Sequence, residues 1–211
     1  MLPSLIILDD FLPDPVGFRE AALALEYDPA FKKGKYPGLP SRSPLAIGNL
    51  DAAISARLGV HVEGMPGTLH QHCRLTLARE TGKTGVHIDP CFYSGILFLS
   101  LNRDCQGGTD FFRHKRTGLE GVPRSDDALL QAGFRSADEC VRRVVNADTN
   151  FPDRWERVMR VPMRFNRLIL FSPWLFHNAA PGFGDRPENA RLVHLMFFAA
   201  ARRPEGQPSN A

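Results

Sequence analysis

The sequence has few cysteines, little net charge and no long hydrophobic run, and each absence argues against a class of protein. Its four cysteines include no Cys-x-x-Cys pair, which disfavours a zinc knuckle or a dithiol redox site. The net charge is only +3, from 26 basic and 23 acidic residues, whereas nucleic-acid-binding domains usually carry a stronger basic stripe. No stretch approaches the roughly 20 apolar residues of a membrane-spanning helix. We therefore expect reduced thiols, no nucleic-acid partner and no membrane span.

The rest of the composition is that of an ordinary folded chain. The 211 residues suit one domain, 43% of them are hydrophobic, and the 15 phenylalanines can fill one interior. Residues 1–8 lack the basic leader and the apolar length of a signal peptide, so a cytoplasmic location is expected. The tail at 202–211, rich in proline, glycine and polar residues, is predicted to be disordered. We expect a single domain over residues 1–201.

The first half of the chain predicts a strand, a helix and a β-hairpin. Leu5–Leu8 is an apolar run of strand length. Asp14 followed by Pro15 predicts the start of a helix, because a capping aspartate and a proline in the first turn both favour a helix N-terminus. The alternation of apolar and polar residues over 70–89, interrupted by a turn at Glu80–Lys83, predicts a hairpin.

A polar stretch at residues 120–155 interrupts the strands of the second half. Within it, Ser136 and Glu139 have the spacing of a capping box, so a helix is expected from there to about Ala147. Strand character resumes at Trp155–Val161. We interpret the stretch as a helical insertion within the one domain.

The most informative residues are His87 and Asp89, which stand two positions apart in Gly-Val-His-Ile-Asp-Pro. In an extended strand the side chains at i and i+2 share a face, so these two can bind one ion together. His177, at the end of a Trp-Leu-Phe-His run far downstream, can supply a third ligand. Two imidazoles and one carboxylate on one side of a metal form the facial triad of non-haem Fe(II) oxygenases. The same set also binds zinc, so a zinc hydrolase or lyase stays open.

The segments around these residues follow a characteristic order. An apolar strand, Tyr93–Leu101, comes after the His-x-Asp pair, and Gly107–Thr109 then precedes two aromatic residues. Asn166–Phe171 leads to His177, and Arg191 opens a final apolar run. This order resembles the 2-oxoglutarate-dependent oxygenase superfamily, in particular its prolyl-hydroxylase-like branch. Residues 6–14, Tyr36–Gly38 and Arg113–Gly118 resemble one bacterial family within that branch. The resemblance covers roughly residues 5–199.

The resemblance implies a fold and a chemistry. The fold is mostly β with flanking helices, a double-stranded β-helix or distorted jelly roll. Fe(II) is bound by His87, Asp89 and His177, with 2-oxoglutarate as the co-substrate. The protein is then a dioxygenase that hydroxylates a small molecule or a peptide. A non-catalytic binding protein with the same fold is the other open alternative.

The resemblance also implies a basic residue that binds the distal carboxylate of 2-oxoglutarate. Arg191 suits this role, because a guanidinium pairs with a carboxylate through two hydrogen bonds and keeps its charge. Alternation along the last strand places Arg191 on one face with Val193, Leu195 and Phe197. The gap from His177 to Arg191 is longer than is usual in the family, which makes Arg186 in the intervening loop the alternative.

A second departure from the family concerns a tyrosine that often contacts the co-substrate. Phe98 stands at its position, and Tyr93 and Ser100 on the same predicted strand are candidates to replace it. Cys91 also lies close to the expected iron. We expect Cys91 to be no ligand, because a thiolate would change the histidine and carboxylate set.

Overall fold

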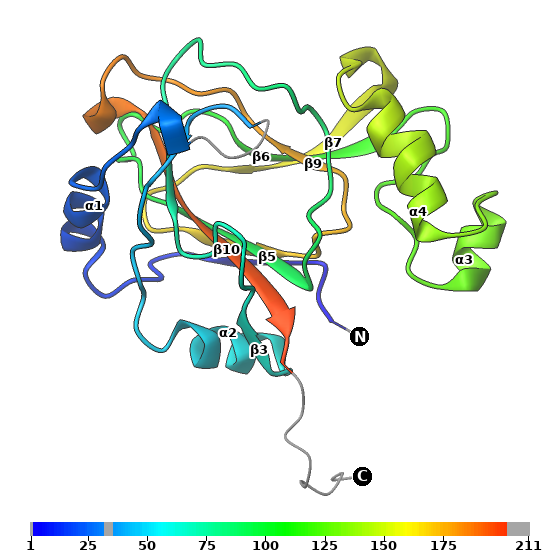
Figure 1. Ribbon diagram of the computed structural model, residues 1–211, viewed down its shortest axis with the longest axis horizontal. Helices are drawn as coiled ribbons and strands as arrows, with labels where there is room; N and C mark the ends of the chain where they lie inside the picture. The colour runs from blue at the N-terminus through cyan, green and yellow to red at the C-terminus, as the bar shows by residue number, and fades with distance from the viewer. Residues whose placement is uncertain (1, 32–35, 202–211) are drawn as a thin grey trace, which may run out of the picture.

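The computed structural model describes residues 2–31 and 36–201, and its strands form two sheets that face each other (Figure 1). The larger sheet contains β1 (Leu5–Leu8), β2 (Leu39–Pro40), β3 (Val62–Gly64), β4 (Cys73–Thr76), β5 (Tyr93–Phe98), β8 (Leu168–Phe171) and β10 (Arg191–Ala200). The smaller sheet contains β6 (Gly108–His114), β7 (Trp155–Pro162) and β9 (His177–Ala179). The predicted tail at 202–211 lies outside the described residues.

The strand order is that of a distorted jelly roll, as predicted. It runs β1-β8-β5-β10-β4-β2 in the larger sheet, with β3 paired to the far end of β10, and β7-β6-β9 in the smaller one. Neighbours within each sheet are antiparallel, and several come from distant parts of the chain, as β10 does between β4 and β5. This connectivity leaves an interior between the sheets that both of them line.

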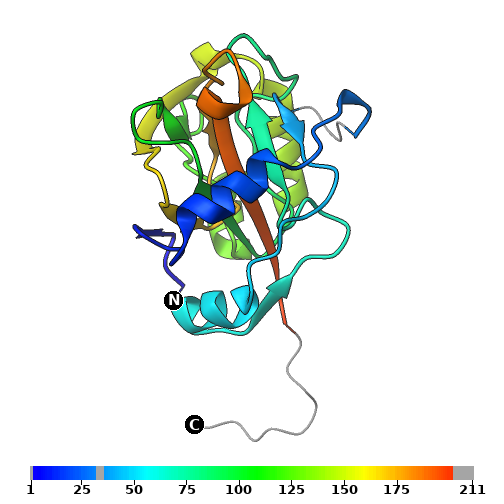
Figure 2. The same ribbon diagram turned by 90° about the vertical axis from the view of Figure 1, so that its left-hand side faces the viewer.

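Two helices cover the outer face of the larger sheet, α1 (Pro15–Leu23) and α2 (Leu50–Leu58). Helix α1 crosses β10 in Figure 2 and begins as predicted, since the Asp14 side chain accepts a hydrogen bond from the Gly17 N–H. Ala22 and Ile54, both fully buried, pack with outward-facing residues of the sheet such as Leu97. No helix in the described part of the chain is long and apolar enough to cross a membrane.

Strand β10 is buried on both of its faces, and its side chains alternate between the two layers. Leu192 and Met196 lie in the core beneath the helices, whereas Val193 and Leu195 lie in the interior between the sheets. An apolar run without polar alternation is what such a doubly covered strand requires. The final strand thus links the outer core to the interior of the jelly roll.

The connection between β6 and β7 contains helices α3 (Asp126–Gln131) and α4 (Ala137–Cys140), a π-helical turn at Val141–Asn146 and a 3₁₀ turn at Pro152–Arg154. The Ser136 hydroxyl caps α4 by accepting from the Glu139 N–H, at 3.1 Å. The return contact of the expected capping box is shifted by one residue, because the Glu139 carboxylate accepts from the Arg135 N–H. These helices form a separate apolar cluster with Trp155 and Phe176.

The predicted hairpin at residues 70–89 is wrong. Its first strand exists as β4, but β2 and β10 occupy both edges of that strand, so no edge is free for the returning segment. The return instead crosses to the smaller sheet, where His87 forms an isolated antiparallel bridge with His177. The correction matters for function, because it moves His87 and Asp89 to the interior between the sheets.

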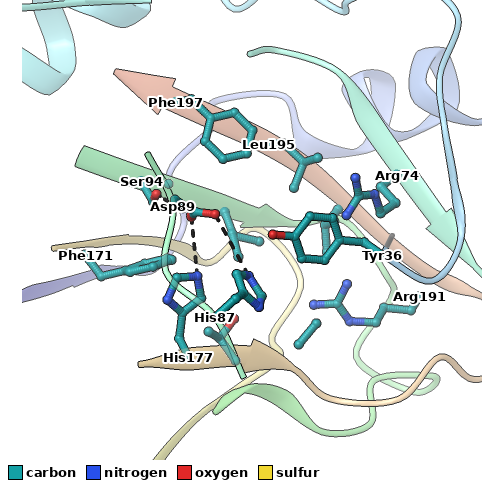
Figure 3. A pocket seen from close by; sticks show the side chains of 15 residues that line it. Tyr36, Arg74, His87, Asp89, Ser94, Phe171, His177, Arg191, Leu195 and Phe197 are labelled. Atoms are coloured by element: carbon teal, nitrogen blue, oxygen red, sulfur yellow. Dashed lines mark hydrogen bonds and ion pairs between the residues drawn. The ribbon is translucent and has the colours of Figure 1, made fainter. Parts of the chain in front are cut away.

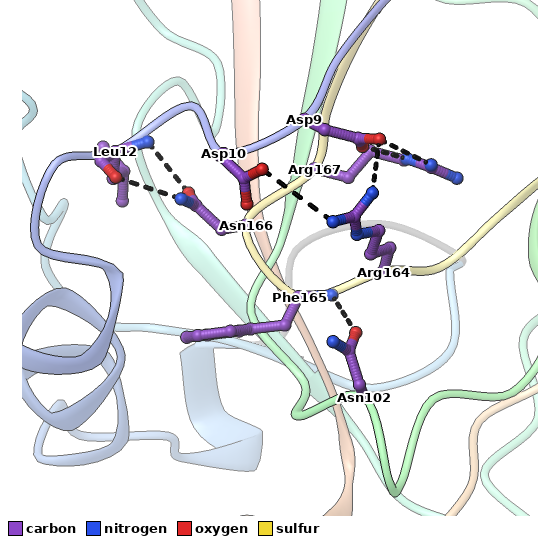
Figure 4. Close-up of polar contacts among 8 residues, drawn as sticks. All are labelled: Asp9, Asp10, Leu12, Asn102, Arg164, Phe165, Asn166 and Arg167. Atoms are coloured by element: carbon purple, nitrogen blue, oxygen red, sulfur yellow. Dashed lines mark hydrogen bonds and ion pairs between the residues drawn. The ribbon is translucent and has the colours of Figure 1, made fainter.

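The loop between β7 and β8 holds the chain that follows β1 (Figure 4). Asn166 is 4% exposed, and its backbone is left-handed with φ of 62°. Its side chain accepts from the Leu12 N–H at 2.9 Å and donates to the Leu12 carbonyl at 3.0 Å. Asp9 accepts hydrogen bonds from Arg164 and Arg167 beside it. The amide of Asn166 therefore satisfies a buried stretch of backbone far away in the sequence.

We expect Asn166→Ala to lower the free energy of unfolding by roughly 2–4 kcal/mol, because it leaves two backbone groups of Leu12 unpaired and places alanine in a left-handed conformation. Equilibrium unfolding in urea measures the change. Arg164→Ala, which removes an exposed ion pair in the same loop, should cost no more than about 1 kcal/mol. Equal losses in the two variants would contradict this account of the loop.

Candidate metal centre

Three side chains from two distant segments meet in the interior between the sheets (Figure 3). His87 and Asp89 precede β5, and His177 is the first residue of β9. One potential ligand atom of each lies within 4.8 Å of those of the other two. An Asp89 carboxylate oxygen is 3.3 Å from Nε2 of His177, and the other oxygen is 3.9 Å from Nε2 of His87. The structure thus brings together the three residues that the sequence singled out.

Backbone hydrogen bonds create this meeting point. The His87 N–H donates to the His177 carbonyl at 2.9 Å, and the His177 N–H donates to the His87 carbonyl at 3.0 Å. The Asp89 N–H donates to the Pro173 carbonyl at 3.0 Å. Because the bridge pairs the two histidines directly, their side chains start from neighbouring backbone positions on one face.

Both imidazole rings are oriented by carbonyl groups of their own segments. Nδ1 of His87 lies 2.9 Å from the Gly85 carbonyl, and Nδ1 of His177 lies 2.8 Å from the Leu175 carbonyl. A carbonyl only accepts, so each Nδ1 carries a proton, and in a neutral imidazole the lone pair is then on Nε2. This is the arrangement by which proteins orient histidine ligands of metals. The two free nitrogens and the carboxylate form a possible set of three donors.

The charge states of the cluster also suit a cation. Burial and the neighbouring His177 lower the pKa of His87 to about 4. Burial acts to raise the pKa of Asp89, but His177, His87 and a 2.7 Å hydrogen bond from the Ser94 hydroxyl outweigh it and lower the pKa to about 2. Metal ligands must be deprotonated, and at neutral pH these two groups already are.

A pocket extends from the cluster to Arg191, the first residue of β10. Val193, Leu195 and Phe197 also line it, so the predicted alternation of this strand is what the structure has. Arg191 is 3% exposed, and its Nε and Nη2 atoms have no hydrogen-bond partner among the described residues. Burial and the nearby Arg74 lower the pKa of Arg191 to about 10. A guanidinium with free donors therefore shares the pocket with the three-donor cluster.

The alternative arginine lies elsewhere. Arg186 is at the surface, with 65% of its side chain exposed, and it pairs with Asp185 at 3.5 Å and Glu188 at 3.8 Å. It does not line the pocket. Of the two arginines that the sequence left open, only Arg191 faces the cluster.

The expected contacts of Tyr93 and Ser100 with a bound co-substrate have no support in the structure. Tyr93 lies on the outer face of β5, because alternate side chains of a strand point to opposite faces, and its hydroxyl donates to the Pro3 carbonyl. The Ser100 hydroxyl donates to the Ala190 carbonyl and accepts from the Leu192 N–H, each at 2.9 Å. Neither residue lines the pocket.

Four polar residues of the pocket were not among the sequence-predicted site residues: Tyr36, Arg74, Ser94 and Thr109. Arg74 stands opposite Val193 in the register of β4 and β10, which places it on the inner face. The alternation of residues 73–77 puts Arg74 and Thr76 on one face of the strand, but it does not show that this face is the interior. The Thr109 hydroxyl is fully buried and has no hydrogen-bond partner in the described part of the chain, and the Gly-Gly-Thr motif marks its position. Tyr36 comes from an irregular loop, where periodicity gives no signal.

Comparison with solved structures identifies the class of fold. SnoK, a non-heme alpha ketoglutarate dependent carbocyclase from nogalamycin biosynthesis, matches with a TM-score of 0.52 and 12% identity over 92% of this chain and 79% of its own. EctD from S. alaskensis with bound Fe gives a TM-score of 0.47 and 17% identity over 93% of this chain and 73% of its own. HygX from Streptomyces hygroscopicus, with nickel, 2-oxoglutarate and hygromycin B bound, gives a TM-score of 0.45 and 14% identity over 93% of this chain and 82% of its own. The likeness to SnoK shows a shared fold.

The sequence itself defines the family. A family described as "Family of unknown function (DUF6445)" matches residues 3–198, so the chain belongs to this family. No curated protein matches the sequence significantly. The match spans both sheets and all three residues of the cluster.

Ser94→Ala should weaken the binding of a divalent metal about tenfold or more, because the Ser94 hydroxyl fixes the Asp89 carboxylate and such supporting contacts are typically worth 10–100-fold in affinity. Isothermal titration calorimetry with Fe(II) under anaerobic conditions measures this affinity. Cys91→Ser is the control, since Cys91 contacts Ser94 but is not one of the three donors. Wild-type affinity in Ser94→Ala, or loss of metal in Cys91→Ser, would contradict this description of the site.

Proposed function

We propose that the protein is a non-haem Fe(II)- and 2-oxoglutarate-dependent oxygenase, with His87, Asp89 and His177 as the iron ligands. The observation that carries the proposal is the pairing of two features in one pocket. One is the cluster of two imidazole nitrogens and a carboxylate, and the other is the buried guanidinium of Arg191. The first suits a metal and the second suits an anion beside it.

The cluster fits Fe(II) by its chemistry. Two neutral imidazoles and one carboxylate on one side of an ion leave its remaining positions open, which is the ligand set of non-haem iron oxygenases. Their pKa values leave the His87 imidazole neutral and the Asp89 carboxylate ionised at neutral pH. When bound, the metal supplies the oxidising chemistry, and the protein contributes the geometry and the environment.

Arg191 fits the distal carboxylate of 2-oxoglutarate. A buried charge without a partner is costly, and none of the described carboxylates pairs with this guanidinium. A carboxylate ligand would restore the missing pair with two parallel hydrogen bonds. In this role Arg191 determines which end of the co-substrate points towards the metal.

The other lining residues shape the surroundings of the reaction. Phe171, Val193 and Leu195 give the pocket apolar walls that exclude water, while the Thr109 hydroxyl offers a further polar contact. The family order of the sequence motifs supports placement in the prolyl-hydroxylase-like branch, with hydroxylation of a small molecule or a peptide as the reaction. A cytoplasmic location is part of the same proposal.

The proposal predicts that adding 2-oxoglutarate to the anaerobic Fe(II) protein produces a visible charge-transfer absorption band. His177→Ala, His87→Ala and Asp89→Ala should each lose most bound iron and with it the band. The fold should persist by circular dichroism, because the bridging hydrogen bonds of His87 and His177 come from the backbone. Normal iron content in His177→Ala would contradict the ligand assignment. A protein that binds iron but shows no band would favour a zinc hydrolase or a binding protein.

Arg191→Met should lower the affinity for 2-oxoglutarate about tenfold or more, because it removes a charge-assisted, two-fold hydrogen bond while keeping the apolar stem. Iron binding should stay within about twofold, since Arg191 is not one of the three donors. The same substitution at Arg186, which is exposed, should leave both affinities unchanged. Titration of the charge-transfer band measures 2-oxoglutarate binding. A larger loss in Arg186→Met than in Arg191→Met would refute the assignment.

A further inference from the structure

A second hollow opens beside the pocket of the metal cluster. It is lined by Thr68, Leu69, Pro90 and Cys91 together with four residues that it shares with the first pocket. The shared residues are Tyr36, Arg74, Asp89 and Phe197. Because Asp89 belongs to both, a molecule in the second hollow would lie next to the proposed iron. Arg191 lines only the first pocket.

Arg74 is the charged group at the boundary between the two hollows. Its Nε atom is buried without a hydrogen-bond partner, and it forms no ion pair with a described residue. Its guanidinium lies over the ring of Tyr36, 5.2 Å from the centroid, and Tyr36 in turn packs edge-on against His87 at 4.7 Å. Arg74 and Arg191 extend into the pocket from the same side (Figure 3). The ring contact holds Arg74 in place, and its buried Nε has no hydrogen-bond partner among the described residues.

The charges of the pocket leave room for one more anion. Fe(II) contributes two positive charges and each arginine one, and Asp89 removes one, so three positive charges remain. The two carboxylates of 2-oxoglutarate neutralise two of these. One positive charge is left over, and the arginine nearer to the second hollow is Arg74.

We infer that Arg74 binds a single anionic group of the primary substrate, so that the substrate is a monocarboxylate whose apolar part lies in the second hollow. Leu69, Pro90 and Phe197 supply the apolar lining for that part. This inference rests on the proposed function, because the position next to Asp89 is meaningful only for a molecule that reacts there. The alternative, in which Arg74 joins Arg191 on 2-oxoglutarate, would leave the second hollow with no cationic group among its lining residues for a substrate.

The test uses protein loaded with Ni(II) and 2-oxoglutarate, and calorimetry with three acids: 4-methylpentanoate, 3-phenylpropionate and N-acetylphenylalanine. Each acid is compared with its neutral amide, which has nearly the same shape. At least one acid should bind ten times or more tightly than its amide. Arg74→Met should abolish this difference, and Arg74→Lys, which keeps the charge, should retain part of it. Arg79→Met removes an exposed charge from the segment after β4 and is the matched control, with the difference unchanged.

Two results would overturn the inference. One is that no acid is preferred over its amide in the wild-type protein. The other is that Arg74→Met weakens 2-oxoglutarate binding as much as Arg191→Met does, which would make Arg74 a second anchor for the co-substrate. Failure of the proposed function has a different outcome: the wild-type metal protein does not bind 2-oxoglutarate at all. In that case the preference for acids, measured with Ni(II) alone, still reports on Arg74.

Discussion

The candidate site depends on one pair of backbone hydrogen bonds, those that His87 and His177 exchange. They join the segment before β5 to β9 of the smaller sheet, and each of the two bonded residues carries an imidazole of the cluster. Asp89 is attached to the same structure by its own bond to the Pro173 carbonyl. Since these contacts are between main-chain groups, the side chains are free to serve a ligand. The same pair of hydrogen bonds therefore joins two distant segments of the jelly roll and brings the three metal-donor side chains together.

The interior between the sheets combines an apolar core with charged groups that are not paired by any residue within 2–31 and 36–201. Phe98, Ile169 and Val193 form a tightly buried cluster between the sheets, and Arg191 is buried next to it with free donors. Folding must desolvate this guanidinium without a compensating carboxylate, which opposes stability. Buried charged groups without a partner are characteristic of functional sites, where binding a ligand requires an arrangement that lowers the stability of the fold. The unpaired donors of Arg191 therefore support the proposal that this pocket binds an anion.

Much of this could be read from the sequence, and the failures have physical causes. Asp14 and Pro15 specified the start of α1 through local capping, and alternation placed Arg191 on the inner face of β10. The prediction of a hairpin at residues 70–89 was wrong, because a strand pattern in the sequence does not reveal which other strands pair with the edges of that strand. The structure gives no support to the predicted co-substrate contact of Tyr93, and the sequence contained the reason, since Tyr93 is an odd number of positions from Phe98 and so faces the opposite side. Tyr36 could not be found, because its place depends on tertiary packing of a loop.

The register of β10 has a consequence for molecular length. Arg191 stands at the start of this strand and Phe197 further along it, and both border the same cavity. Each pair of residues advances a strand by about 7 Å, and side chains return to the same face at that interval. Under the proposed function, the distance from the Arg191 guanidinium to the metal sets the length of the dicarboxylate that binds. That length is the number of carbons between its two carboxylates. A change in preferred chain length would then require the anchor to move by a whole strand period, because intermediate positions point away from the cavity.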